Sequence, residues 1–145
     1  MAISKREFEV LAAFRYKLRQ FLAFSEKASG AMGLTQQQYQ ALLTMRAHAS
    51  PDPLTISDLA ARMLIKHHSA VGMVNRLEQQ GMVRREGAGA DRRKVAIRLT
   101  ERGARVFAKL ASVHMRELRR IAPDLESFFG YFARRGANRK RRARS

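Results

Sequence analysis

The side chains best suited to bind a ligand lie in two consecutive segments, residues 66–80 and residues 81–103. The first has apolar residues at helical spacing from Ala70 to Leu77, which leaves its polar residues on the remaining faces. Arginine offers a forked donor to guanine, asparagine a donor–acceptor pair to adenine, and serine a hydroxyl to bases or phosphates. The candidate contacts on this predicted helix are Lys66, His67, His68, Ser69, Gly72, Asn75 and Arg76.

The second segment has the pattern of a β-hairpin with a basic tip. A short apolar strand at Met82 and Val83 leads into a Gly/Ala loop, and a strand with alternating apolar and polar residues follows at 94–99. Three cations in the loop exceed what one aspartate can pair, which favours contact with a polyanion over a local salt bridge. The loop residues are Asp91, Arg92, Arg93 and Lys94.

Each segment could instead be a solvated polar surface. A polar helix face alone would favour that interpretation, but a basic hairpin directly after the helix favours DNA contact. Gly72 supports the same prediction, since glycine in a helix interior costs about 1 kcal/mol and a close backbone approach to DNA would justify it.

The composition points to a polyanionic partner. The 145 residues carry a formal net charge of +17, and 46% of them are hydrophobic, enough for one domain with a core. The absence of cysteine excludes disulfides, thiolate zinc sites and thiol-based redox sensing. Residues 1–6 lack the apolar core of a signal peptide and no apolar run approaches a membrane span, so we expect a cytoplasmic protein without a membrane partner.

The elements that must position these segments are mostly helices. We expect one helix over 5–29 and another over 66–80. Between them we expect two further helices that begin at Thr35 and Thr55, each opened by a capping box. A long helix capped by Thr100 should end at Pro123, followed by a short apolar helix and a basic, disordered tail over 134–145. The broad apolar surface of residues 5–29 needs a partner helix, which a second chain could supply.

Four motifs in order closely resemble the MarR family of transcription regulators. They are Leu34–Tyr39, Leu54–Ala60, Val74–Val83 and the pair Asp91-Arg92-Arg93 with Leu99–Gly103. The resemblance covers residues 34–121. It implies a mainly α fold with a small β-hairpin wing. In this fold a winged helix-turn-helix lobe covers residues 34–103 and belongs to a single unit of residues 1–133. It also implies N- and C-terminal dimerisation helices over 5–33 and 104–133, and a homodimer on a pseudo-palindromic operator in double-stranded DNA.

The resemblance also assigns roles at the wing. Arg93 is the expected minor-groove contact and Asp91 the residue that braces the loop, although Arg92 could exchange roles with Arg93. Many family members bind a small amphipathic, often anionic aromatic effector, for which Phe14, Phe21, Tyr39 and Arg46 could line a pocket or could equally form ordinary core. The Lys66-His67-His68 start of the helix departs from the family pattern, so base preference cannot be carried over.

We find no catalytic constellation, metal site or cofactor motif. His67 and His68 are adjacent and point in different directions on a helix, and His48 and His114 are isolated. The predicted function is therefore that of a sequence-specific DNA-binding regulator, most simply a repressor, rather than an enzyme. The alternative is a non-specific architectural protein that binds nucleic acid through charge, which the +17 charge would support.

Overall fold

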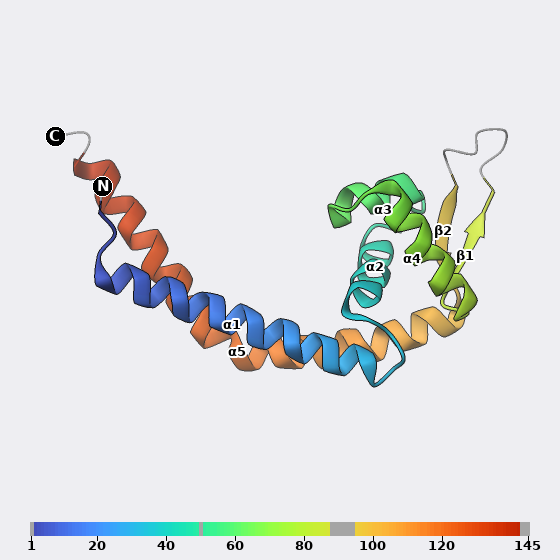
Figure 1. Cartoon of the computed structure of the whole chain (residues 1–145), viewed down its shortest axis with the longest axis horizontal. Helices are drawn as coiled ribbons and strands as arrows, with labels where there is room; N and C mark the ends of the chain where they lie inside the picture. The colour runs from blue at the N-terminus through green and yellow to red at the C-terminus, as the bar shows by residue number, and fades with distance from the viewer. Residues whose placement is uncertain (1, 50, 88–94, 143–145) are drawn as a thin grey trace. The chain divides into compact units, whose positions relative to one another are not determined.

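The computed structural model describes residues 2–49, 51–87 and 95–142, with side chains described as far as Arg135. It is mainly helical with one antiparallel hairpin, as the sequence predicted (Figure 1). None of the helices in these ranges is long and apolar enough to cross a membrane. The elements in chain order are α1 (Lys5–Gly30), α2 (Gln36–Ala47), α3 (Ile56–Met63), α4 (His67–Gln79), β1 (Val83–Glu86), β2 (Ala96–Leu99) and α5 (Glu101–Arg142).

Two compact units make up the chain. We call Glu26–Val113 the central lobe, and Met1–Ser25 together with His114–Ser145 the terminal-helix unit. The expected boundaries at 33/34 and 103/104 differ from this division, because the end of α1, the residues directly after it and the start of α5 pack on the core of the central lobe. The residues that do so include Ala28, Met32, Phe107 and Leu110.

The core of the central lobe is built from residues of every element in it. Leu42, Leu59, Val74, Leu77 and Ile97 are among the side chains that are fully buried there. Their spacing matches one face of each helix and one face of the hairpin, so the apolar pattern of the sequence determines which sides meet.

Local capping fixes where the helices of the lobe begin. Thr35 and Thr55 each accept from the backbone N–H three residues on, while Gln38 and Asp58 accept from the N–H of the respective threonine, which confirms both predicted capping boxes. Thr100 accepts from the N–H of Gly103 at 3.0 Å, as a cap of α5 should.

The hairpin pairs β1 with β2 in a register that places Val83 opposite Leu99 and Arg84 opposite Arg98. The segment before α3 adds to the outer edge of β2: Ile97 donates its N–H to the Leu54 carbonyl and Ile56 donates to the Val95 carbonyl. Val95, Ile97 and Leu99 pack toward the core, as their alternation predicted. The wing is thus anchored to the helix-turn-helix by backbone hydrogen bonds.

The expectation that Pro123 ends the long helix is wrong. α5 continues through Pro123 to Arg142, so residues 134–142 of the expected disordered tail are helical; residues 143–145 lie outside the described part. Proline removes one helical hydrogen bond, but packing within the terminal-helix unit compensates. Phe14 contacts the rings of Phe128, Phe129 and Phe132 at centroid distances of 5.7, 5.9 and 5.8 Å.

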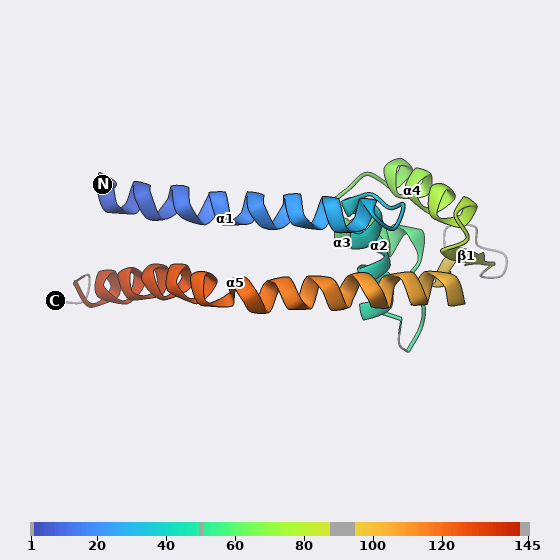
Figure 2. The same cartoon turned by 90° about the horizontal axis from the view of Figure 1, so that it is seen from below.

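Beyond this aromatic cluster, α5 extends an existing helix, which costs less than nucleating a new one. Figure 2 shows α5 as one continuous ribbon beside α1, with the start of α1 and the last turn of α5 at the same end of the terminal-helix unit. Lys17 of α1 and Asp124 of α5 form an ion pair at 3.0 Å, directly after the proline. His114 and Ser25, both buried, lie within hydrogen-bond distance at 2.8 Å.

Candidate nucleic-acid interface

α4 separates its apolar and polar residues cleanly. Ala70, Met73, Val74 and Leu77 are buried in the lobe core. The polar residues that the sequence singled out here are exposed, namely Lys66, His67, His68, Ser69, Asn75 and Arg76. Gly72 is half-buried. The structure therefore brings the predicted contacts of residues 66–76 together on the side of α4 that faces solvent.

Gly72 is not required by packing inside the lobe. A Cβ atom placed on it would meet no heavy atom within 4 Å. The free protein thus gives no steric reason for glycine at this position, which keeps the close approach of another molecule as the prediction.

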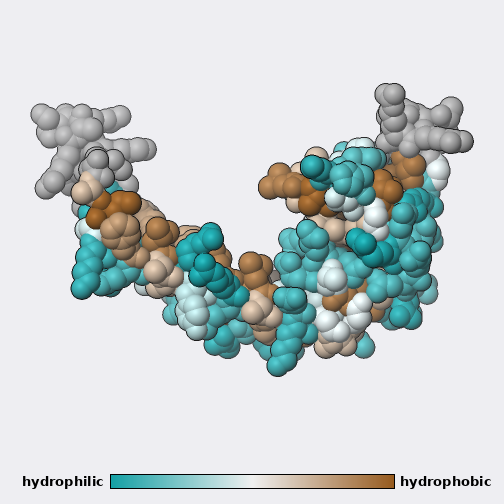
Figure 3. Space-filling model, viewed as in Figure 1, coloured by the Kyte–Doolittle hydropathy of each residue, from teal (hydrophilic) through white to brown (hydrophobic). Residues whose placement is uncertain are grey.

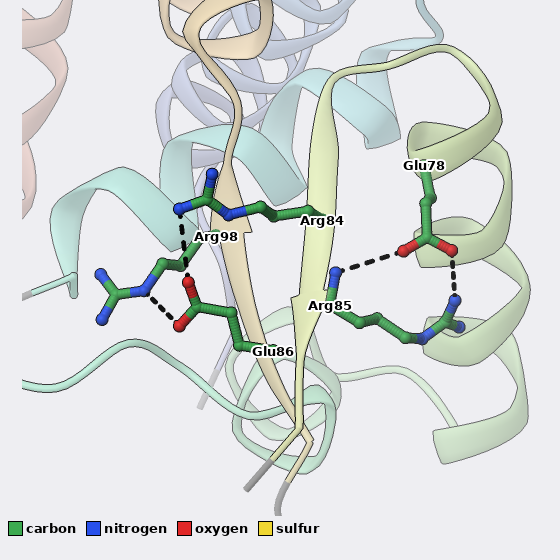
Figure 4. A network of polar contacts seen from close by, with 5 residues as sticks. All are labelled: Glu78, Arg84, Arg85, Glu86 and Arg98. Carbon is green, nitrogen blue, oxygen red and sulfur yellow. Dashed lines mark hydrogen bonds and ion pairs between the residues drawn. The ribbon is translucent and has the colours of Figure 1, made fainter.

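A polar network joins the end of α4 to the wing (Figure 4). Arg85 of β1 donates from Nη1 to Oε1 of Glu78 at 2.8 Å, and its main-chain N–H donates to Oε2 of the same carboxylate at 3.2 Å. Arg85 also donates from Nη2 to Oδ1 of Asn75. Because arginine has only donors, the amide oxygen of Asn75 must be the atom that faces it.

This contact constrains the orientation of the Asn75 amide, because Arg85 donates to its oxygen. The oxygen keeps a second lone pair and the NH2 group is a donor. Asn75 can therefore still offer a donor and an acceptor to a base edge, in the orientation that the contact with Arg85 imposes.

A second cluster lies on the hairpin itself. Arg84 and Arg98 are directly opposite in the strand register, which alone would be repulsive. Glu86 lies between them: Arg98 Nε donates to its Oε2 at 2.7 Å, and Arg84 Nη2 lies 3.3 Å from its Oε1. The hydrogen bond from Arg98, with the nearby charges of both arginines, lowers the pKa of Glu86.

Sequence reasoning missed these partners. Glu78, Arg85 and Glu86 were not singled out, although two arginines at opposed strand positions are a signal that a carboxylate should lie between them. The predicted tip residues Asp91, Arg92, Arg93 and Lys94 lie outside the described residues, so their roles stay predictions. The structure does place the two strand ends, Glu86 and Ala96, that lead into that loop.

The four candidate effector residues have distinct surroundings. In the central lobe, Tyr39 is buried and stacks on Phe107 at 6.2 Å between ring centroids, and burial raises the pKa of its hydroxyl; Arg46 is exposed. In the terminal-helix unit, Phe14 belongs to the aromatic cluster and Phe21 meets His114 edge-on at 6.1 Å. Tyr39, Phe14 and Phe21 thus all have packing partners of their own.

One cavity of about 190 Å³ lies in the terminal-helix unit and includes none of the four candidate residues. Its walls include Arg6, Val10, Phe128 and Tyr131. Within the described ranges, no three His, Cys, Asp or Glu side chains come together in a group that could hold a metal ion.

A helix-turn-helix followed by a hairpin packed on the same core defines a winged-helix protein. The model of the MarR family matches residues 32–94, which span α2 to the wing. The chain is 29% identical over 106 residues to the organic hydroperoxide resistance transcriptional regulator of Bacillus subtilis, covering 73% of this chain and 67% of that protein. Over these residues the chain is similar to the MarR family of transcriptional regulators.

Solved structures agree on the fold. AbsC, a MarR family transcriptional regulator from Streptomyces coelicolor, superposes with a TM-score of 0.73 at 23% identity, covering 95% of this chain and 99% of AbsC. The MepR–DNA complex of S. aureus gives 0.72 at 15% identity, covering 98% and 99%. Among the first three curated relatives, the matched segment covers 48% to 67% of the relative's own length.

Proposed function

We propose that the protein regulates transcription by binding specific DNA sequences through α4 and the wing. The observation that carries this proposal is the arrangement of α4, whose apolar side is fully used by the lobe core while its polar residues from Lys66 to Arg76 are exposed. A helix presented in this way, with a basic hairpin beside it, fits the major groove of B-DNA.

Charge supports the same proposal. A formal net charge of +17 attracts DNA over long distances and promotes non-specific association. Specificity has to come from groups that meet base edges, and α4 supplies several of these, including Ser69, Asn75 and Arg76.

We further propose that the active form is a homodimer. Large hydrophobic side chains of the terminal-helix unit are open to solvent in the single chain, and Figure 3 shows hydrophobic residues along these helices. A second copy would cover them, and a twofold protein would bind a pseudo-palindrome with half-sites about 10 bp apart. The exposed residues include Phe8, Leu11, Tyr16, Leu22, Met115, Phe129 and Phe132.

The regulatory outcome we propose is repression that a small amphipathic or anionic aromatic effector relieves. The dimer has one form that binds the operator and one that does not. Such an effector must have the higher affinity for the form that does not bind the operator. Exposed Arg46 is the cationic group among the four candidate lining residues.

Selection of bound fragments from random duplex DNA, combined with sedimentation of the free protein, tests the proposal. We expect an enriched twofold motif, a dimer, and operator binding at least about 10³-fold tighter than binding to random DNA at physiological salt. Equal affinity for all duplexes, with a steep salt dependence, would instead support the non-specific architectural protein. A stable monomer on a one-sided site would contradict the dimer.

A further inference from the structure

Three helices of the central lobe end in the same hydrogen-bonded turn. In each, a residue one to three positions after the last helical residue has a positive φ and donates to the carbonyl three positions back, while the next residue donates to the carbonyl five positions back. After α1 and α4 the positive φ belongs to Gly33 (75°) and Gly81 (72°). After α3 it belongs to Leu64 (57°).

Leu64 is the one non-glycine residue with a positive φ among the described residues. Its turn is complete: Leu64 donates to Ala61 at 3.3 Å and Ile65 donates to Ala60 at 3.1 Å. The left-handed conformation disfavours a branched side chain, and the chain uses glycine at the two equivalent turns. The leucine therefore strains this turn without being needed to form it.

The side chain of Leu64 does not compensate for this strain by packing. It is 92% exposed, whereas the next residue, Ile65, packs on the lobe core. All other exposed large hydrophobic residues of the described chain belong to the terminal-helix unit. A single apolar side chain is too small a patch to dock a protein, but it is the right size for one methyl group.

The neighbours of Leu64 indicate where that methyl group lies. The exposed residues Lys66, His67 and Ser69, at and after the start of α4, are the ones proposed to face DNA. In the major groove each thymine presents a C5-methyl group, which apolar side chains recognise. We propose that Leu64 contacts a thymine methyl group in each half-site and so determines specificity at that base pair; this inference rests on the proposed DNA-binding function.

The test combines protein and DNA substitutions. In the operator selected by the wild-type protein, each thymine is replaced in turn by deoxyuridine, which removes only the methyl group. We expect the wild type to lose about fourfold in affinity at one position of each half-site, the value for one buried methyl group. L64A and L64G should bind the thymine operator several-fold more weakly than the wild type does. Deoxyuridine at that one position should not reduce their affinity further.

Stability measurements separate the contact from a folding defect. L64G should melt about 3 °C above the wild type because it relieves the positive φ, yet bind the operator as weakly as L64A. L64M serves as the control, since methionine keeps an apolar side chain of similar volume at the same position. It should retain the preference for thymine over deoxyuridine.

Three outcomes would overturn the inference. In the first, L64A binds the operator as tightly as the wild type. In the second, the loss of affinity caused by L64A adds to the loss caused by deoxyuridine at every position. In the third, L64A weakens binding to random and operator duplexes equally, as the loss of a sugar contact would. In each case a wild type that still prefers its operator leaves the regulator proposal standing. A wild type with no preference would refute the regulator proposal and this inference together.

Discussion

Arg85 of β1 is held by both oxygens of the Glu78 carboxylate on α4, one accepting from its main chain at 3.2 Å and the other from its side chain at 2.8 Å. The same guanidinium contacts Asn75 one helical turn earlier. The strand β1 and α4 are therefore held together by this contact. We expect the orientation of the loop that follows β1 to depend on it.

Replacing Glu78 with alanine should uncouple the two elements. We expect the free energy of unfolding to fall by about 1 kcal/mol, because the pair is partly exposed, and operator affinity to fall more than this loss of stability would suggest. Thermal melts and fluorescence anisotropy on the same samples would measure both effects. Glu101→Ala is the matched control, since that carboxylate is almost fully exposed and lies 3.9 Å from Arg105; equal effects of both variants on DNA binding would contradict the coupling.

Gly72→Ala should separate stability from binding. Because a Cβ atom finds open space there, we expect alanine to stabilise α4 by about 1 kcal/mol and, if the backbone approaches DNA, to weaken operator binding. Gly103→Ala is the contrasting variant: its Cβ would lie 1.9 Å from the Met82 carbonyl oxygen, so we expect a loss of about 3 kcal/mol. Unchanged operator affinity in the stabilised Gly72 variant would show that DNA stays clear of this position.

Arg93→Ala should weaken operator binding by about tenfold or more without changing the melting temperature. Anisotropy titrations against the selected operator would measure the loss, with Arg105→Ala on α5 as an exposed control. Asp91→Ala should weaken binding less, by loosening the loop. A normal Arg93 variant together with a defective Arg92 variant would reverse the two roles, and no effect from either would refute the wing contact.

The basic segment 134–145 should contribute affinity without specificity. Replacing its seven cations with glutamine lowers the formal net charge from +17 to +10 while keeping residues that favour helix. We expect weaker binding to every duplex, an unchanged preferred operator, and a salt dependence flatter by about 0.9 log unit per lost phosphate contact. An unchanged slope would indicate a passive tail. The substituted residues are Arg134, Arg135, Arg139, Lys140, Arg141, Arg142 and Arg144.

Features encoded by neighbouring residues were predictable from the sequence. The capping boxes at Thr35 and Thr55 and the alternation from Val95 to Leu99 each involve residues a few positions apart, and all are present. Features that depend on packing between distant residues were not. Pro123 reads locally as a helix end, and the contacts of Phe14 with the helix beyond it cannot be seen in the local pattern.

The candidate site shows the same division. Which residues of α4 face solvent follows from its helical period, so the polar residues from Lys66 to Arg76 were found. The contact between Asn75 and Arg85 was not predicted, because the two residues come together only after the chain has turned at Gly81 into the wing. Leu64 escaped notice because nothing in its local sequence marks a left-handed turn where glycine would be expected.

The way the hairpin is bordered bears on how this protein behaves at high concentration. Exposed strand edges allow chains to pair with one another and aggregate. Here the outer edge of β2 is occupied by residues 54–56, and on β1 the Arg85 N–H is occupied by a side-chain carboxylate that cannot continue a sheet. Many copies gathered on neighbouring DNA sites could therefore crowd their wings together with less risk of joining them into a shared sheet.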